Sequence, residues 1–360
     1  MFQFQCYCRV IGTWLLLSML STEAYSNSSA KQASEQLTYI DKFAKVAPER
    51  SREAIKQYGH LTKYLDKKAK QQWHMKGAEV GNRLNDLGLM ERSLKKLSFL
   101  AVEDFSTENS TLKLTLLGHF SLKSYFLIEA QQAYSCFFSK TQAADGKLRG
   151  AYMIANSYLS LGDVKAAQSI VLRLYEVAKG LNKTSWFGAI QSTLGIYALH
   201  RKDYAVAARY FRDSMVQHQK VNRYSGEFNS ALNLLLTFAL DNSAKYERLL
   251  YRVVRLSVKN GDSDRMELIK LIKVLRKVKS DKYYRVDEAQ VNRIMDNIQS
   301  STVSTAAKEF ILPYVLSSYQ REAKWSKPAP DWIKTILTNQ LCFESKATLD
   351  DVIRSLETFK

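Results

Sequence analysis

Apolar and polar residues alternate with helical spacing through most of the chain. After Leu148, small or apolar residues recur three or four positions apart, first at Ala151, Ile154, Ala155 and Tyr158 and then at Val164, Ala167, Val171 and Leu174. Residues at this spacing share one face of an α-helix. Helix breakers are scarce, because no proline occurs between Pro48 and Pro313. The pattern predicts an all-α protein.

Short polar turns separate these helical series. The first lies at LSLGD, where Gly162 suits the end of a helix and Asp163 the start of the next. The second lies at LHRKD, forty residues on, where Asp203 takes the place of Asp163. The chain is therefore expected to form antiparallel helix pairs joined by tight turns.

The helix pairs repeat along the sequence. Small residues stand at Gly81, Gly118, Ala155 and Gly195, with steps of 37, 37 and 40. A second small residue follows each of them by twelve positions, at Ser93, Ala130, Ala167 and Ala207. Self-similarity at 20 to 50 residues is typical of stacked repeats. Small side chains at matched positions indicate places where two helices cross closely, since a larger side chain would overpack by about 1–3 kcal/mol.

The repeats resemble the tetratricopeptide repeat family in a divergent form typical of bacterial extracytoplasmic members. The match is carried by Leu194, Gly195, Ala207 and Phe211, by Leu117, Gly118, Ala130 and Tyr134, and by Tyr158 and Ala167. The tryptophan that usually opens a unit and the proline that closes it are missing, and the steps exceed the 34 residues of the family. The resemblance implies a right-handed superhelical solenoid of antiparallel helix pairs.

Four segments follow from these patterns. Residues 1–26 form a predicted signal peptide, 27–69 amino-terminal helices, 70–260 the tetratricopeptide-like repeats, and 261–360 degenerate helical repeats with a carboxy-terminal cap. Thr237 and Leu249 are either a fifth small-residue pair or part of a generic helical hairpin. Further helices are expected near 264–279, 286–299, 302–324 and 348–358.

The first 26 residues match the layout of a secretory signal. One basic residue, Arg9, precedes the apolar run VIGTWLLLSML, and Ala24 and Ser26 give a small-x-small site for cleavage after Ser26. An ordinary helix or a short anchor is the alternative. The prediction is an exported protein of the bacterial periplasm. Cleavage leaves Cys136 and Cys342, 206 residues apart, which are expected to be buried free thiols.

Positive charge is concentrated in the middle of the chain. The formal net charge is +18, and residues 111–285 hold 28 basic and 13 acidic side chains. Arg248, Arg252, Arg255 and Lys259 form one helical stripe, and Lys270, Lys273 and Lys277 form another. The opposite face of the second helix is apolar, at Met266, Ile269, Ile272 and Leu275. The stripes are either a solvated face or a surface for an acidic partner.

Candidate chemistry is sparse. The five histidines lie apart, and the chain has no HExxH, GxSxG, P-loop or GxGxxG motif. No catalytic site, cofactor or metal is therefore predicted. If the array curves as the resemblance implies, Asn156, Gln191 and Tyr197 are expected to line its concave face.

These features favour a non-catalytic exported scaffold that binds a protein or peptide, as a sensory or envelope-assembly partner. The partner could be acidic, or an anionic polymer of the envelope, whereas an exported destination disfavours nucleic acid. The alternative is an envelope polysaccharide or peptidoglycan factor, or an enzyme built on a helical superhelix.

Overall fold

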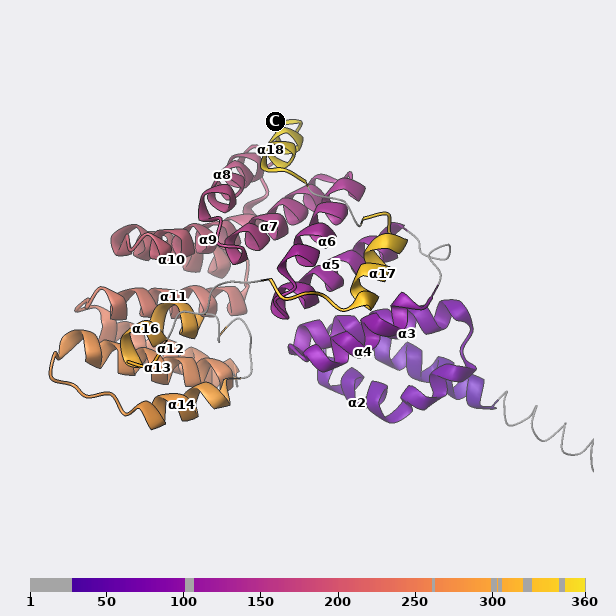
Figure 1. The fold of residues 1–360 in the computed structure, drawn as a ribbon, viewed down its shortest axis with the longest axis horizontal. Helices are drawn as coiled ribbons and strands as arrows, with labels where there is room; N and C mark the ends of the chain where they lie inside the picture. Colours follow the sequence, from indigo (N-terminus) through magenta and orange to yellow (C-terminus); the bar gives the residue numbers. More distant parts are fainter. Residues whose placement is uncertain are drawn as a thin grey trace, which may run out of the picture. The chain divides into compact units, whose positions relative to one another are not determined.

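The computed structural model describes residues 28–100, 107–260, 263–298, 303, 306–319, 326–342 and 347–359 (Figure 1). These residues form helices and turns, and the described part of the chain contains no strand. The prediction of an all-α helical-repeat protein is confirmed. Among the described helices, none combines the length and the apolar character needed to span a bilayer. The predicted signal peptide, residues 1–26, lies outside the described residues.

The chain divides into two compact units. Unit 1 comprises Met1–Phe120 and Ala329–Glu344, and unit 2 comprises Ser121–Pro328 and Ser345–Lys360. Each unit therefore combines an amino-terminal or central stretch with a carboxy-terminal piece. Each unit is discontinuous in sequence, because carboxy-terminal helices pack on helices much earlier in the chain.

Unit 1 is built on an early helical core. Its described helices are residues 28–43, α2 (Pro48–Tyr58), a 3-10 turn (Gly59–Tyr64), α3 (Lys67–Leu84), α4 (Leu87–Ser98), the part of α5 (Thr107–Lys123) up to Phe120, and α17 (Asp331–Asn339). Trp73 of α3 is buried in a cluster with Ile40 and Leu61. The late helix α17 packs on α4, and Trp332 lies 5.5 Å from the ring of Phe120.

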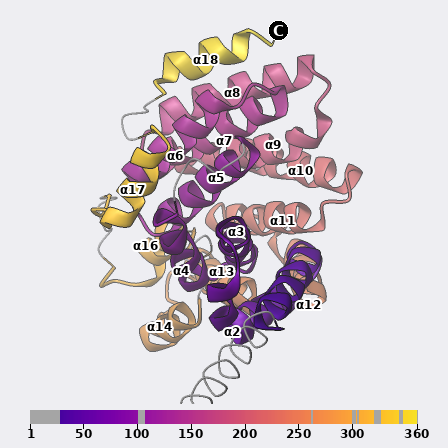
Figure 2. The same ribbon diagram turned by 90° about the vertical axis from the view of Figure 1, so that its right-hand side faces the viewer.

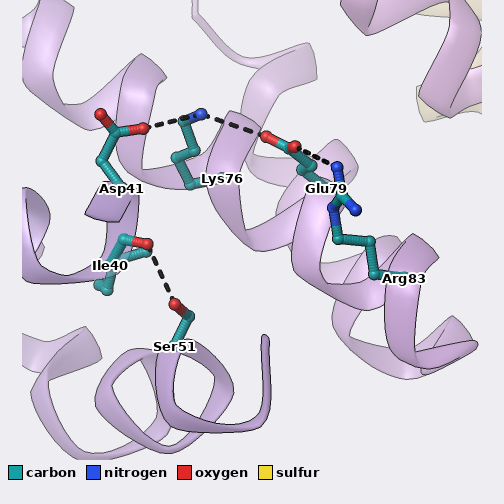
Figure 3. Close-up of polar contacts among 6 residues, drawn as sticks. All are labelled: Ile40, Asp41, Ser51, Lys76, Glu79 and Arg83. Carbon is teal, nitrogen blue, oxygen red and sulfur yellow. Dashed lines mark hydrogen bonds and ion pairs between the residues drawn. The ribbon is translucent and has the colours of Figure 1, made fainter. Parts of the chain in front are cut away.

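A set of ion pairs joins α3 to the first described helix of unit 1 (Figure 3). The ammonium of Lys76 lies 2.8 Å from Asp41 and 3.1 Å from Glu79, and Arg83 lies 3.3 Å from the other oxygen of Glu79. Beside it, the hydroxyl of Ser51 donates to the carbonyl of Ile40 at 3.0 Å. The buried carboxylate of Glu79 thus has a cation for each oxygen.

Unit 2 is a succession of helices that pack each on the next. They are α6 (Leu127–Lys140), α7 (Ala144–Ser160), α8 (Val164–Gly180), α9 (Phe187–His200), α10 (Tyr204–Lys220), α11 (Tyr224–Leu240), α12 (Tyr246–Asn260), α13 (Ser263–Ser280) and α14 (Glu288–Asn297). The largest contacts join α9 to α10 and α10 to α11. Figures 1 and 2 show these helices stacked in chain order, as antiparallel hairpins. Thr237, the first residue of the possible fifth pair, is buried in α11, and Leu249, the second, lies in α12. The two helices pack on each other, so this region is a helical hairpin.

The turns of unit 2 recur at even intervals. Gly162, Asn182, Lys202, Asn222 and Asn242 all have positive φ, between 51° and 90°, and stand twenty residues apart. At each turn the following amide bonds back to the preceding helix, as from Asp163 to Tyr158 at 2.9 Å and from Asp203 to Ala198 at 2.9 Å. This is the Schellman helix ending. The carboxylates of Asp163 and Asp203 then cap the next helix, as the sequence predicts.

Small residues lie at the helix crossings. Gly81, Gly118, Ala155 and Gly195 are buried, and so are Ser93, Ala130, Ala167 and Ala207. A Cβ atom at Gly195 would come within 2.6 Å of the ring of Phe211. The predicted role of the small residues is therefore confirmed.

The carboxy-terminal part departs from the predicted helices at two places, and the first is α17, a helix that was not expected. A single helix was expected over 302–324, but the described residues there form a π-helix (Ala307–Ile311) and a short α16 (Leu312–Val315). Pro313 lies in the first turn of α16, where its missing N–H breaks continuous helical bonding. Farther on, α18 (Leu349–Glu357) packs on α8 within unit 2, and both views show the two helices side by side (Figures 1 and 2).

Candidate binding surfaces

The exposed side of α12 carries alternating cationic and apolar residues. We call it the α12 outer face, and it comprises Glu247, Arg248, Tyr251, Arg252, Arg255 and Val258. The opposite side packs into the core through Tyr246 and Val253. Helical periodicity alone separates the two sides, as expected for a strongly amphipathic helix.

The arginines of the α12 outer face differ in their contacts. Arg252 lies 2.6 Å from Glu227 of α11, which is 7% exposed and also accepts from Gln219 at 2.7 Å. Arg248 and Arg255 form no ion pair with the described residues, although the guanidinium of Arg255 lies over Tyr251 at 5.8 Å. The predicted stripe thus contains one arginine tied to the core and two that face solvent. Lys259 lies on α12, but its side chain is outside the described ones.

The exposed side of α13 is also basic. Lys270, Lys273 and Lys277 are exposed, while Ile269, Ile272 and Leu275 are buried and Met266 is partly buried. Two of the lysines have contacts, Lys270 with Glu267 at 2.6 Å and Lys277 over the ring of Tyr284 at 5.4 Å. The predicted two-sided character of this helix is therefore present. Lys273 remains without an ion pair among the described residues.

The predicted concave-face residues lie in different environments. Asn156 and Gln191 are half-buried, whereas Tyr197 is fully buried, so the placement of Tyr197 on an open face was wrong. Thr193 lies one turn before Tyr197 on α9 and accepts a hydrogen bond from Tyr152 of α7 at 3.0 Å, while donating to Ala189. Tyr197 lies instead in the packed interior of unit 2. Burial, and after it the nearby Tyr152, raise the pKa of the Tyr197 hydroxyl.

The two described cysteines are not free thiols. Cys136 and Cys342 are buried, and both are disulfide-bonded. The expectation of free thiols was therefore wrong, because spacing along the sequence does not decide which cysteines a fold oxidises. Cys342 lies just after α17.

A cavity of 360 Å³ lies where α18 meets α8. It is lined by Ser169, Leu172, Arg173, Glu176, Ile353 and Glu357. Arg173 and Glu357 form an ion pair across the two helices at 2.9 Å. The cavity is wide open to solvent and contains no histidine or cysteine, and its ion pair joins α18 to α8.

Titratable residues elsewhere are dispersed. Within the described residues, no three histidine, cysteine or acidic side chains gather closely enough to hold a metal ion. His200 lies 3.6 Å from Glu309 of the π-helix, and its ring lies edge-on to Phe310. His218 is buried between helices, where burial and then the charge of Arg223 lower its pKa. These contacts join helices of unit 2.

Comparisons with known proteins add little. The sequence matches no protein-family model and no curated protein. Among solved structures, the fold is similar to that of a Rap protein crystallised in complex with competence and sporulation factor. The identity is 11%, the match covers 92% of this chain and 100% of the other, and the TM-score is 0.46. A likeness at this level says nothing about what this chain binds.

Proposed function

We propose that the chain is a non-catalytic helical-repeat protein that binds an acidic protein partner outside the cytoplasm. The observation that carries the proposal is the solvent-facing basic surface of α12 and α13. Residues 246–280 contain ten basic and four acidic side chains. Arg248, Arg255 and Lys273 are exposed and have no ion pair with the described residues. Surfaces of one sign attract partners of the other sign and raise their association rates about 10- to 1000-fold at low salt.

Two further features support an oxidising compartment. Disulfides persist in secreted and periplasmic proteins and are rare in the cytosol, and both described cysteines are disulfide-bonded. The first 26 residues have the layout of a signal peptide. Export therefore belongs to the proposal, and in a bacterial cell the periplasm is the compartment that fits.

The binding test uses charge reversal with a matched control. We expect that Arg248→Glu, Arg255→Glu and Lys273→Glu together abolish salt-sensitive cross-linking to envelope proteins. A control with Lys165→Glu and Lys220→Glu makes similar reversals at exposed lysines elsewhere in unit 2 and should retain it. Identical cross-linked partners for the wild-type and the charge-reversed proteins would overturn the proposal. Co-sedimentation with cell-wall sacculi instead of proteins would favour the polysaccharide alternative.

Export has its own test. Protein taken from cells, denatured without reductant and treated with an alkylating reagent should show no label on Cys136 or Cys342, and its sequence should start at Asn27. Labelled thiols together with an intact amino terminus would place the protein in a reducing compartment.

A further inference from the structure

The α12 outer face combines charge with large exposed apolar groups. Tyr251 and Val258 are each 69% exposed, and they alternate with the exposed Arg248 and Arg255. The order Arg248, Tyr251, Arg255, Val258 has steps of three, four and three, so the four side chains form one row along the helix. The row spans ten residues, or roughly 15 Å of helix.

The fold does not need these apolar side chains. The core side of α12 is already supplied by Tyr246 and Val253, which are 2% and 0% exposed. Single exposed apolar residues are common on protein surfaces. The α12 outer face differs because Tyr251 and Val258 lie in one row with two arginines that have no ion pair among the described residues. Apolar residues flanked by cations are typical of surfaces that bind an amphipathic partner.

We propose that the α12 outer face binds an acidic amphipathic helix of the partner protein. The inference rests on the function proposed above and specifies the shape of the acidic partner. Leucine-like side chains at helical spacing on the partner cover Tyr251 and Val258, and carboxylates beside them face Arg248 and Arg255. Charge complementarity selects an acidic partner, and the apolar residues select a helix over an unstructured polyanion. Arg252 holds α12 to Glu227 and is not part of the contact.

Glu247 is the acidic residue at the amino-terminal end of the α12 outer face. It is exposed at the start of α12, one residue before Arg248. An acidic partner is repelled there, so we expect its carboxylates to lie toward Arg255, in the second half of α12.

The experiment uses defined probes and the full chain. The first probe is a synthetic helical peptide of leucine, alanine and glutamate with leucine at i, i+4 and i+7 and glutamate on the flanks. The second has the same composition in a scrambled order that forms no apolar stripe. Poly-L-glutamate and phosphatidylglycerol vesicles test a plain polyanion and a lipid surface. Dissociation constants are measured by fluorescence anisotropy or, for vesicles, by co-sedimentation.

Three variants separate charge from apolar contact. Arg248→Gln with Arg255→Gln removes the cations, and Tyr251→Ser with Val258→Ser removes the apolar groups. Val216→Ser with Tyr283→Ser is the control, because Val216 and Tyr283 are the same residue types, 48% and 80% exposed, on other parts of unit 2. We expect the helical peptide to bind wild type and control equally, and each α12 variant about tenfold more weakly, as for a central interface contact. Circular dichroism confirms that each variant is folded.

The outcomes separate the two proposals. Loss of binding on removal of the arginines but not of Tyr251 and Val258, or equal binding of the scrambled peptide, overturns the helical partner and leaves an acidic partner in place. Stronger binding of vesicles than of the helical peptide also overturns it. No binding of the helical peptide to wild type overturns this inference, whereas failure of the cross-linking test overturns the proposed function.

Discussion

Two helix crossings, at Gly81 of unit 1 and Gly195 of unit 2, place different obstacles beside the glycine. In unit 1, a Cβ atom at Gly81 would lie 2.9 Å from two backbone atoms, the carbonyl of Asp86 and the amide of Met90. In unit 2, a Cβ atom at Gly195 would lie 2.6 Å from the ring of Phe211, which is a side chain. A ring can shift by a few tenths of an ångström more readily than a backbone can. A small residue in the sequence therefore marks both crossings, although the two crossings differ in how well they tolerate a larger side chain.

The units also differ in how they satisfy a buried glutamate. Glu79 of unit 1 is paired by Lys76 and Arg83, which lie on its own helix (Figure 3). Glu227 of unit 2 is paired by Arg252, which comes from the next helix and belongs to the basic stripe. In unit 1 the ion pairs of Glu79 lie within α3, and Lys76 also pairs with Asp41 of the first described helix. In unit 2 the ion pair of Glu227 ties the proposed binding helix α12 to the core, so the stripe is partly a structural feature.

The largest expected effect tests the crossings. Gly81→Ala should lower the free energy of unfolding by about 2–3 kcal/mol, and Gly195→Ala by about 1 kcal/mol, because overpacking costs depend on how far the neighbour can move. Chemical denaturation measures both. Gly180→Ala is the control, since no described atom lies within 4 Å of its Cβ position. Equal losses at Gly81 and Gly195 would contradict the comparison.

Two lysines of unit 1 should respond oppositely to the same substitution. Lys113 is buried and donates to the carbonyl of Leu97 at 3.3 Å, and burial lowers its pKa to about 8. The unfolded chain then binds more protons between pH 8 and 10.5, so this lysine makes stability rise with pH across that window. Lys113→Met should remove this rise of stability with pH.

Lys76→Met is the matched comparison. Burial disfavours the charged form of Lys76, but Asp41 and Glu79 outweigh it and raise its pKa. Its contribution is full below the unfolded pKa and is lost as the pH rises through the folded value. Lys76→Met should therefore destabilise the protein at pH 7, because Glu79 loses a partner. Thermal denaturation from pH 7 to 10.5 measures both variants, and a shift of the same sign would contradict the assignment.

The smallest effect separates the two buried glutamates. Arg252→Ala removes the cation that comes to Glu227 from another helix and should cost about 1 kcal/mol, because Arg252 is half exposed and its ion pair is partly screened. Arg83→Ala should cost less than about 0.5 kcal/mol, because Lys76 still pairs with Glu79. Urea titrations of the two variants measure the difference. An equal or larger loss for Arg83→Ala would show that the origin of the cation does not matter.

Much of the repeat could be predicted because its signals are local. The helix end at Gly162 and the caps at Asp163 and Asp203 were predicted, whereas the turns at Asn182, Asn222 and Asn242 were not. The two sides of α12 and α13 likewise follow from helical phase. Tyr251 and Val258 lie on the same side of the helix as the predicted basic stripe, but a pattern of charges alone does not include them.

Other features of the candidate site depend on contacts between distant residues. Phase on α9 reveals neither that Thr193 meets Tyr152 nor that Tyr197 is buried. The partner of Arg252 lies 25 residues away on a different helix. Such pairings depend on how helices pack, and a single helical pattern holds no information about its neighbour.

The sequence by itself determined most of the helices, the caps at Asp163 and Asp203 and the small residues at the crossings, since each follows from interactions within a few turns of chain. Tertiary structure decided the rest: that α17 packs on α4 and α18 on α8, that both cysteines are oxidised, and which arginines of α12 face solvent. Burial and pairing depend on atoms brought together from remote parts of the chain, and folding alone supplies those neighbours.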